Sequence, residues 1–509
     1  MKINKLFFLI IVCLPLQVIY GQQRVDSLSF FRKIENQYQI EREFKSNYYY
    51  NPANKLDYSN FSFSNFEVAY NKQRDKKYLL QGGDDKQTFA VRSNSYKRIK
   101  DNQVLWGAVS YQNQKQKNVQ WNSIIDLDKI GPYALGDSVK GINKMEVYSF
   151  TGGYAKAFNR FGFGLSMRYN ATSNYRDSDP RPKSTSSDIL ISLGASYNFY
   201  KQYKVSFIGA INHYTQDTNV SYVSKIRKAA AYQMIGLGVY NNFFSNAPTT
   251  AYYRGNGYTT GLSLGRENDI ALNITYSKSN LEKEAKRGNG NEYYTINELD
   301  TSIFTIEAIK QISFSNHTIL GKVKYDNVKK DGIDVLYSNN TSYITKLLEK
   351  KLYKYQENNT LIEALYKYDA GHYTLSVQPF FSYQKVKEHL KEYERRQEFT
   401  YNNYGVDVAY MQQLNKKNLL TIKPYLALRK ATKSVNALKI EDNKEGIKQW
   451  LINDFEVLSS DYTTYGAVLR YDYFIKNNVG LYISGDLQKL KYKNYKSNDY
   501  YGVTLGVTF

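Results

Sequence analysis

Several residue types and patterns are scarce in this 509-residue chain, and each scarcity excludes a class of protein. A single cysteine, Cys13, excludes a disulfide-rich scaffold and a cysteine-based metal site. The mean hydropathy is −0.59 and no apolar run reaches the roughly 18 residues of a membrane helix, which excludes a helical membrane protein. The four histidines stand apart from one another, so the usual general base of an enzyme lacks partners.

Aromatic and basic residues are abundant instead. The chain has 51 tyrosines, 16% aromatic residues and a formal net charge of +22. Its aromatic and β-branched content excludes a disordered chain. A length of 509 would ordinarily predict several domains, yet no linker-like stretch divides the sequence. The composition therefore predicts one large β structure.

Residues 1–21 are expected to form a secretory signal peptide. Two lysines precede an apolar stretch at residues 6–16, which is too short to span a bilayer. We expect cleavage between Gly21 and Gln22, after a small residue. Cys13 would leave with the leader, and the basic count would fall from 69 to 67 against 47 acidic residues, a net charge of +20.

From about residue 60 onward, apolar residues alternate with small or polar ones, which predicts β-strands with one apolar face. The clearest case is residues 160–169. One face there holds Phe161, Phe163, Leu165, Met167 and Tyr169, and the other holds Gly162, Gly164, Ser166 and Arg168. The pattern returns at residues 189–199, 270–277, 404–410, 465–473 and 479–486.

The length of these runs favours a transmembrane barrel over a β-sandwich. Sandwich strands average about 5 to 6 residues, whereas a tilted transmembrane strand needs roughly 9 to 11. Tight turns also alternate with long connections, as in outer-membrane barrels with short inner turns and long outer loops. We place eight tight turns at residues 100–103, 159–160, 201–202, 267–269, 315–316, 370–371, 415–418 and 476–478.

The eight inner turns join eight hairpins of two strands each, and one strand before and one strand after them complete the barrel. They predict an all-β, antiparallel, up-and-down barrel of about 18 strands, with 16 and 20 as the neighbouring alternatives. Twenty strands would require residues 229–240, which alternate but join no tight hairpin, to enter the barrel. Pro379 and Pro424 fall inside predicted strands, where proline cannot donate to the ladder, so we expect a bulge at each. Long outer loops are predicted at residues 112–143, 172–186, 282–301, 331–354 and 433–460.

The last nine residues resemble the C-terminal β-signal of bacterial outer-membrane barrels. They alternate without a break and end on an aromatic residue, so one face carries Tyr501, Val503, Leu505, Val507 and Phe509. The resemblance implies recognition by the barrel-insertion machinery through strand addition. It also implies an outer-membrane location, where the N–H and C=O groups of a final strand need partner strands.

Residues 22–59 come before the alternating pattern begins, and they are predicted to form a periplasmic N-terminal segment ahead of a barrel at 60–509. Asp26 is placed to cap a short helix, whose repeating positions are Leu28, Phe31, Ile34 or Glu35, and Tyr38.

Two resemblances concern the N-terminal segment and the whole chain. Asn51-Pro52-Ala53 resembles the N-terminal segment of the long-chain fatty-acid transporter family, which implies a hatch inside the barrel. A plain turn is the alternative, since Pro52 alone sets the chain extended before a strand. The whole chain resembles Gram-negative outer-membrane barrel families of unassigned function, with a leader, a short periplasmic segment and a large barrel. A TonB-dependent receptor is disfavoured, because its plug domain is well over twice as long.

No catalytic, cofactor or metal site is predicted, and we expect no enzymatic activity. His317 and His372 fall at inner turns, and His213 and His389 are predicted at outer strand ends, all without a nucleophile or carboxylate cluster. Acidic pairs such as Asp84-Asp85 supply too few oxygens for calcium. The glycines at 254–257 and 287–290 lack the strand-to-helix setting of a phosphate loop.

The positive charge is assigned to a membrane setting rather than to nucleic acid. It would meet the phosphates of outer-membrane lipids or bias the lumen toward anions. The candidate lumen charges are Arg168, Lys423 and Arg470, although an error of one residue in register would move each to the lipid face.

Together these features predict a monomeric outer-membrane barrel that acts as a channel or diffusion-type transporter for an unidentified solute. The alternative is a structural or assembly barrel that anchors or partners a surface or secretion complex. The expected partners are outer-membrane lipids and the barrel-insertion machinery, with no nucleic acid.

Overall fold

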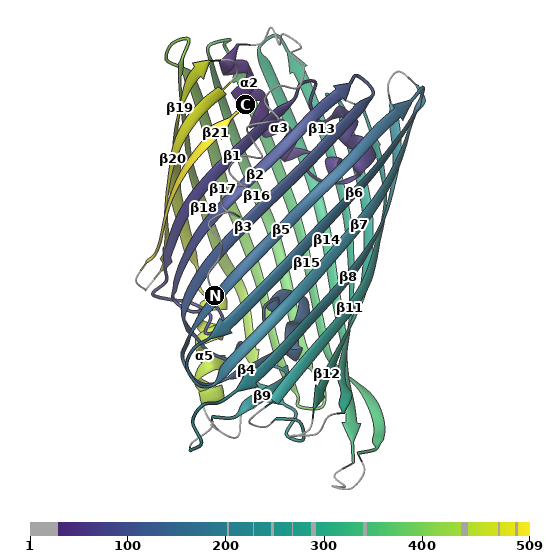
Figure 1. Ribbon diagram of the computed structural model, residues 1–509, viewed down its shortest axis with the longest axis vertical. Coiled ribbons are helices and arrows are strands. Elements are labelled where there is room, and N and C mark those ends of the chain that lie inside the picture. The colour runs from purple at the N-terminus through teal and green to yellow at the C-terminus, as the bar shows by residue number, and fades with distance from the viewer. Residues whose placement is uncertain are drawn as a thin grey trace, which may run out of the picture.

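The structure is a computed structural model that describes residues 29–200, 203–226, 229–245, 249–266, 268–286, 292–338, 344–438, 446–476, 479–493 and 497–509. An 18-stranded antiparallel sheet closes on itself, because β1 (Phe63–Arg74) pairs with both β2 (Asp85–Lys100) and β21 (Asn498–Thr508) (Figure 1). Closure satisfies the backbone groups of the first and last strands, which a lipid environment requires. The predicted fold class and the strand number of 18 are confirmed.

The other barrel strands follow one another in chain order. They are β3 (Gln103–Val119), β5 (Gly141–Phe158), β6 (Phe161–Arg176), β7 (Arg181–Asn198), β8 (Lys204–Ser221), β11 (Thr249–Gly265), β12 (Ile270–Lys286), β13 (Tyr293–Phe314), β14 (His317–Tyr337), β15 (Lys346–Asp369), β16 (Tyr373–Leu390), β17 (Arg395–Gln413), β18 (Asn418–Ala437), β19 (Tyr462–Lys476) and β20 (Val479–Tyr492).

Short connections gather at one end of the barrel, here called the inner end, which is uppermost in Figure 1 together with the C-terminus. They lie at the eight predicted tight turns, of which residues 201–202, 267 and 477–478 are outside the described part of the chain. Asn159 (φ 51°) and Ser315 (φ 50°) adopt the left-handed backbone that two-residue hairpin turns require. Local turn chemistry therefore sets the inner end.

Three of the predicted outer loops are largely strand. Residues 172–186 contain only a short connection between β6 and β7, and residues 282–301 and 331–354 continue β12 to β15 beyond the apolar band. The prediction was wrong there because polar residues such as Glu282, Glu284 and Lys286 take the outward positions beyond the apolar band, while the backbone pairing continues. Residues 112–143 and 433–460 do contain long connections.

The prolines produce gaps in the ladder instead of the bulges that we expected. The β15–β16 pairing runs from Glu363–Phe380 to Tyr366–Val377 in one register and omits the pairs around Pro379. The β17–β18 pairing likewise omits the pairs around Pro424. The missing N–H removes ladder bonds on one side only, and the neighbouring pairs hold the register.

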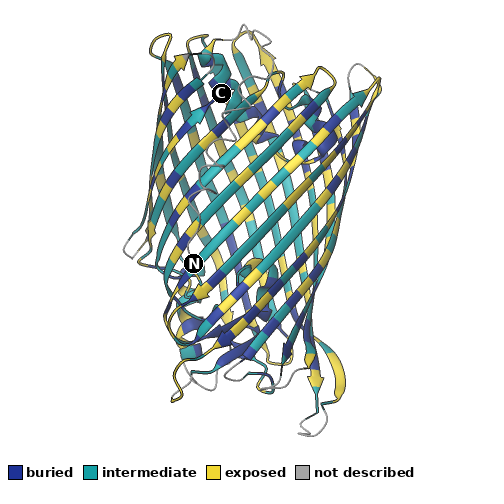
Figure 2. Cartoon of the chain, viewed as in Figure 1, coloured by how far each residue is buried: buried dark blue, intermediate teal, exposed yellow. Residues whose placement is uncertain are grey.

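The apolar faces predicted from alternation lie on the outside of the barrel. Phe161, Phe163 and Leu165 are 52%, 52% and 50% exposed, and Figure 2 shows exposed and buried residues alternating along the tilted strands. Aromatic and aliphatic side chains left this exposed would be unfavourable in water but suit a lipid bilayer. The barrel exterior is therefore a membrane surface.

The inner segment, residues 29–62, precedes β1 and lies at the inner end. It contains α2 (Phe30–Gln37), α3 (Ile40–Phe44) and the short 3-10 helices η2 (Tyr48–Tyr50) and η3 (Pro52–Asp57). The predicted short helix is confirmed as α2, which buries Phe31, Ile34 and Glu35. Ser29 caps it, and the predicted positions Asp26 and Leu28 lie outside the described residues. No helix of the described chain is long and apolar enough to cross a membrane.

The outer cap, residues 120–140, 229–245 and 446–461, lies at the opposite end. It contains α4 (Leu127–Ile130), η4 (Gly131–Tyr133), α5 (Ile447–Leu458) and a separate small sheet of β4 (Leu135–Asp137), β9 (Ala231–Gly236) and β10 (Val239–Tyr240). Residues 229–240 thus pair with β4 and stay out of the barrel wall, which is why the barrel has 18 strands and not 20.

Candidate passage through the barrel lumen

The Asn51-Pro52-Ala53 element docks the inner segment against the lumenal wall. The Asn51 side chain accepts a hydrogen bond from the Ala53 N–H at 2.9 Å, which starts η3, and donates one to the Phe207 carbonyl at 2.9 Å. Close by, the Ser206 hydroxyl donates to the Asn54 side chain at 2.7 Å. The element is thus both a local turn and a contact with β8.

Two glycines of the wall make room for this element. A Cβ atom at Gly164 would lie 2.4 Å from the Pro52 carbonyl carbon, and one at Gly194 would lie 2.1 Å from the Asn51 Oδ1 atom. Both distances are far inside van der Waals contact, so the backbone of the inner segment can approach β6 and β7 only because these positions lack side chains.

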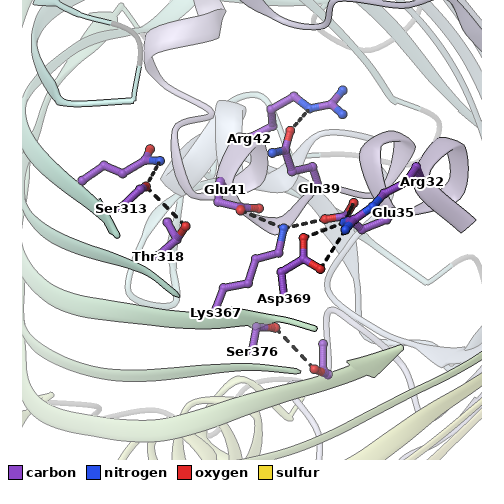
Figure 3. Close-up of polar contacts among 12 residues, drawn as sticks. Arg32, Glu35, Gln39, Glu41, Arg42, Ser313, Thr318, Lys367, Asp369 and Ser376 are labelled. Atoms are coloured by element: carbon purple, nitrogen blue, oxygen red, sulfur yellow. Dashed lines mark hydrogen bonds and ion pairs between the residues drawn. The ribbon is translucent and has the colours of Figure 1, made fainter. Parts of the chain in front are cut away.

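A cluster of five charged residues, here called the latch, joins α2 and α3 to β15 (Figure 3). The Arg32 guanidinium donates to both carboxylate oxygens of Asp369, at 2.5 and 3.0 Å. Lys367 donates to Glu35 at 2.6 Å and to Glu41 at 2.9 Å. Glu35, Glu41 and Lys367 are nearly buried, so each charge depends on its partners.

Other contacts fix the inner segment around the wall. Asn47 donates to Glu307 at 2.8 Å, and Lys204 donates to Asp57 at 2.5 Å. An apolar cluster adds to them, with Phe44, Tyr48 and Tyr49 packing on Ala271, Ile309, Leu320 and Leu365. The segment is therefore attached to strands on several sides of the inner end.

The structure places the three candidate lumen charges on the lumenal face. Arg470 hydrogen-bonds Asp472 at 2.6 and 2.9 Å, and its guanidinium lies 4.2 Å from the ring centre of Tyr38 in the inner segment. Lys423 lines a cavity together with inner-segment residues. Burial raises the pKa of Tyr50, and the charge of Arg168 opposes that shift. Their role in selectivity stays a prediction.

The outer cap packs against the wall through an aromatic core. Trp121 stacks on Trp450 of α5, with ring centres 5.1 Å apart. Tyr133 and Leu135 belong to a second cluster, which includes wall residues from several strands, namely Tyr214, Val220, Ala251, Tyr253, Leu281, Leu299, Leu352, Tyr353 and Leu390. The cap is therefore a folded core inside the outer mouth, visible at the lower end of Figure 1.

Buried polar contacts hold two parts of the cap. Arg176 of β6 donates to both oxygens of Asp137 at 3.1 and 3.2 Å, and both side chains are fully buried. The Asp454 side chain of α5 accepts hydrogen bonds from the Leu80 N–H at 3.1 Å and from the Trp450 indole N–H at 2.7 Å. Burial raises the pKa of Asp454 despite these donors.

A cavity of about 670 Å³ lies between the cap and the wall. It is lined by both apolar and ionisable side chains, among them Lys330, Tyr353, Tyr355, Glu357, Glu388, Trp450 and Asp454. Tyr355 donates to Glu357 at 2.7 Å. Aromatic faces beside carboxylates suit a solute with both apolar and hydrogen-bonding surfaces.

The remaining predicted residues occupy separate places. Tyr501, Val503 and Leu505 are exposed on the outside of β21, Val507 shares their face, and the exposed Phe509 follows the strand. Their role in insertion stays a prediction. The cleavage pair Gly21 and Gln22 lies outside the described residues.

The histidines lie apart from one another, as their spacing suggested. His317 begins β14, contacts Tyr366 at 2.8 Å and stacks on Phe314, and His372 belongs to the β15–β16 turn. His213 lies in the middle of β8, bonded to the Asn256 side chain at 2.8 Å, and not at the outer strand end that we expected. Within the described chain, no group of three potential metal ligands is found.

Sequence reasoning missed the latch and the outer cap. The latch pairs residues up to 337 positions apart, for which a single sequence holds no signal. The cap helix α5 did have a signal in the sequence, because Ile447, Trp450 and Leu451 recur at helical spacing inside a predicted loop.

A closed barrel with an apolar exterior and an occupied polar lumen defines the class of outer-membrane β-barrels. The chain belongs to a family of unknown function, DUF6850, which matches residues 32–509. This match confirms the prediction that the chain belongs to an outer-membrane barrel family of unassigned function. A search of curated proteins finds no match.

Among solved structures, similar ones include two outer-membrane receptors. The ferric yersiniabactin uptake receptor FyuA from Yersinia pestis is 11% identical, with 88% of this chain and 79% of that chain covered and a TM-score of 0.44. The siderophore receptor PiuA from Acinetobacter baumannii is 8% identical, with 88% and 82% covered and a TM-score of 0.43. Similarity at this level does not extend to what those receptors bind, and the expectation that this chain is not a TonB-dependent receptor stays a prediction.

Proposed function

We propose that this protein is a gated transporter, which passes a polar solute through its lumen when the inner segment leaves the inner end. The observation that carries the proposal is the latch, because it attaches a movable segment to a polar wall through charged groups. If the segment left, water could solvate both halves of each ion pair, so the open state would not strand a buried charge.

The lumenal face that the inner segment covers supports this proposal. Glu307, Lys322, Lys367 and Asp369 line it beside serine, threonine and glutamine side chains. Such a wall suits water and polar solutes once it is uncovered.

Single-channel conductance in planar bilayers tests the proposal. We expect the wild type to be closed most of the time, and the variants Arg32→Ala and Asp369→Ala to open more often, because each removes one side of a bidentate ion pair. Lys350→Ala is the matched control, since its pair with Glu392 at 2.8 Å lies at the outer rim.

One combination of results would overturn the proposal. If the latch variants and a deletion of residues 29–58 all stay silent, with folding verified by heat-modifiable gel mobility, no gated passage exists. The alternative, a scaffold or assembly barrel, would then hold. The folded aromatic core of the outer cap is the observation that favours that alternative.

A further inference from the structure

A second cavity, of about 320 Å³, lies between the inner segment and the wall and is lined by none of the five latch residues. A single water needs only roughly 10 to 15 Å³ of such volume, so the cavity has room for a small solute. Three basic side chains line it, Arg42 and Lys55 from the inner segment and Lys423 from β18. Among its lining residues Glu43 is the one acid, which leaves an excess of two positive charges.

Arg42 is built into this cavity with part of its hydrogen-bonding capacity unused. The side chain is only 6% exposed, and its Nε atom donates to Gln39 at 3.0 Å. Its Nη1 atom is buried and has no hydrogen-bond partner among the described residues. Figure 3 shows Arg42 bonded to Gln39, with its guanidinium directed away from the Lys367 cluster, so the latch carboxylates do not pair with it.

Lys55 and Arg42 also lie against aromatic rings. The Lys55 ammonium lies 3.8 Å from the ring centre of Tyr58, and Arg42 lies 5.0 Å from the same ring. No carboxylate lies within ion-pair distance of Lys55 or Lys423 in the described part of the chain. A buried guanidinium without a close ion pair is costly, so an anion bound beside it would stabilise this arrangement.

We infer that this cavity binds a small anion carrying a phosphate or carboxylate group, held by Arg42, Lys55 and Lys423. The planar guanidinium supplies paired donors for an oxyanion, and the two lysines add point charges. The inference deepens the proposed transport function, on which it rests, by naming the substrate class as anionic. It also gives Lys423 a defined role among the predicted lumen charges.

The electrostatics of the inner segment agree with an incomplete counter-charge, because the charge of Glu41 opposes the effect of burial on the pKa of Arg42 without cancelling it. Burial lowers the pKa of Lys55 to about 8, and the positive charge of Arg42 adds to that shift. Burial also lowers the pKa of Arg42. An anion between them would offset both effects, because an opposite charge favours the protonated forms. Binding would therefore tighten the inner segment against the wall.

Calorimetric titration of the detergent-purified full chain tests this site, with inorganic phosphate and succinate as separate probes at neutral pH. We expect at least one probe to bind the wild type, and both Arg42→Gln and Lys423→Gln to weaken its binding at least tenfold. Lys423→Arg should retain most of the affinity. Lys350→Gln, at the outer rim, is the control for general loss of charge.

Two outcomes would overturn the inference: neither probe binds the wild type, or binding is unchanged in both Arg42→Gln and Lys423→Gln. Lys423 belongs to the wall, so Lys423→Gln keeps the test valid if Arg42→Gln disturbs the inner segment. Binding in detergent does not depend on conduction. Anion binding with silent bilayers would therefore contradict transport alone, and currents without anion binding would contradict the site alone.

Discussion

Gly164 and Gly194 show how single residues control the position of the inner segment. Neither has a positive φ, so the backbone conformation does not require glycine at either position. What requires it is the approach of Asn51 and Pro52, whose atoms occupy the space that a side chain would fill. The two faces of β6 therefore meet different partners: its apolar residues face lipid, and Gly164 faces the inner segment.

The substitution Gly164→Ala should loosen the inner segment without harming the barrel. The new Cβ would meet backbone atoms, which cannot move aside as a flexible side chain could, at a cost of about 1–3 kcal/mol. We expect faster tryptic cleavage within residues 29–62 and more frequent channel opening. Gly152→Ala is the control, because a Cβ there meets nothing within 4 Å. Equal protease resistance in both variants would contradict the docking geometry.

Lys55 should make the docking of the inner segment depend on pH. Its docked pKa of about 8 lies below the ordinary 10.5, so the undocked segment binds more protons between these values. Docking should therefore strengthen as pH rises from about 8 to 10.5, at most tenfold per pH unit for one proton, and stay constant below that window.

This pH dependence can be measured as open probability from pH 7 to 10 in the latch-weakened Asp369→Ala variant. Open probability should fall as the pH rises above about 8, and adding Lys55→Met should abolish that fall. A response that persists unchanged in the double variant would assign it to another group.

At the scale of elements, the latch is the attachment between α2, α3 and β15. Lys367 serves two carboxylates at once, while Arg32 pairs with Asp369 at the more exposed edge of the cluster. The two halves should therefore differ in strength, because solvent screens the exposed pair more than the buried one.

Lys367→Met should release the inner segment more strongly than Arg32→Ala does. It removes the cation that Glu35 and Glu41 share, so that Glu35 keeps only Arg32 at 3.0 Å and the buried Glu41 loses its ion pair, a cost of about 3–5 kcal/mol. Adding Glu35→Gln and Glu41→Gln should recover most of the loss, since neutral amides do not repel. Hydrogen exchange of residues 30–44 measures both steps, and a triple variant no better than Lys367→Met would contradict the role of charge.

At the scale of the whole molecule, the barrel separates two environments with one wall. Alternate residues of every strand face lipid and lumen, so the same chain must satisfy both. The two ends are then occupied by different structures, a latched segment at the inner end and an aromatic core at the outer end. Apolar clusters hold both ends, but the inner end also depends on the ion pairs of the latch, which water can hydrate, so we expect it to open more readily.

Adjacent residues of β21 should respond in opposite ways to the same charge. Leu505 is 56% exposed on the lipid face, so Leu505→Lys should destabilise the folded barrel, by at most the roughly 2–4 kcal/mol that a lysine costs at the bilayer midplane. Thr504→Lys places the same charge on the lumenal face and should cost much less. Urea titration of the protein in lipid vesicles compares the two variants, and equal destabilisation would mean that the face assignment is wrong.

The sequence by itself predicted about 18 strands, the apolar face of the strands with clear alternation, and the inner turns. Alternation with period two and turn residues such as Asn159 are local signals, which a single chain carries in order. Only the tertiary structure decided what fills the lumen. Closing the barrel brings Arg32 to Asp369, and Arg42 and Lys55 to Lys423, but contacts between distant polar residues leave no periodic pattern. The physical reason is that lipid demands apolar residues at every second position, whereas a lumen accepts any side chain that water or a partner can satisfy.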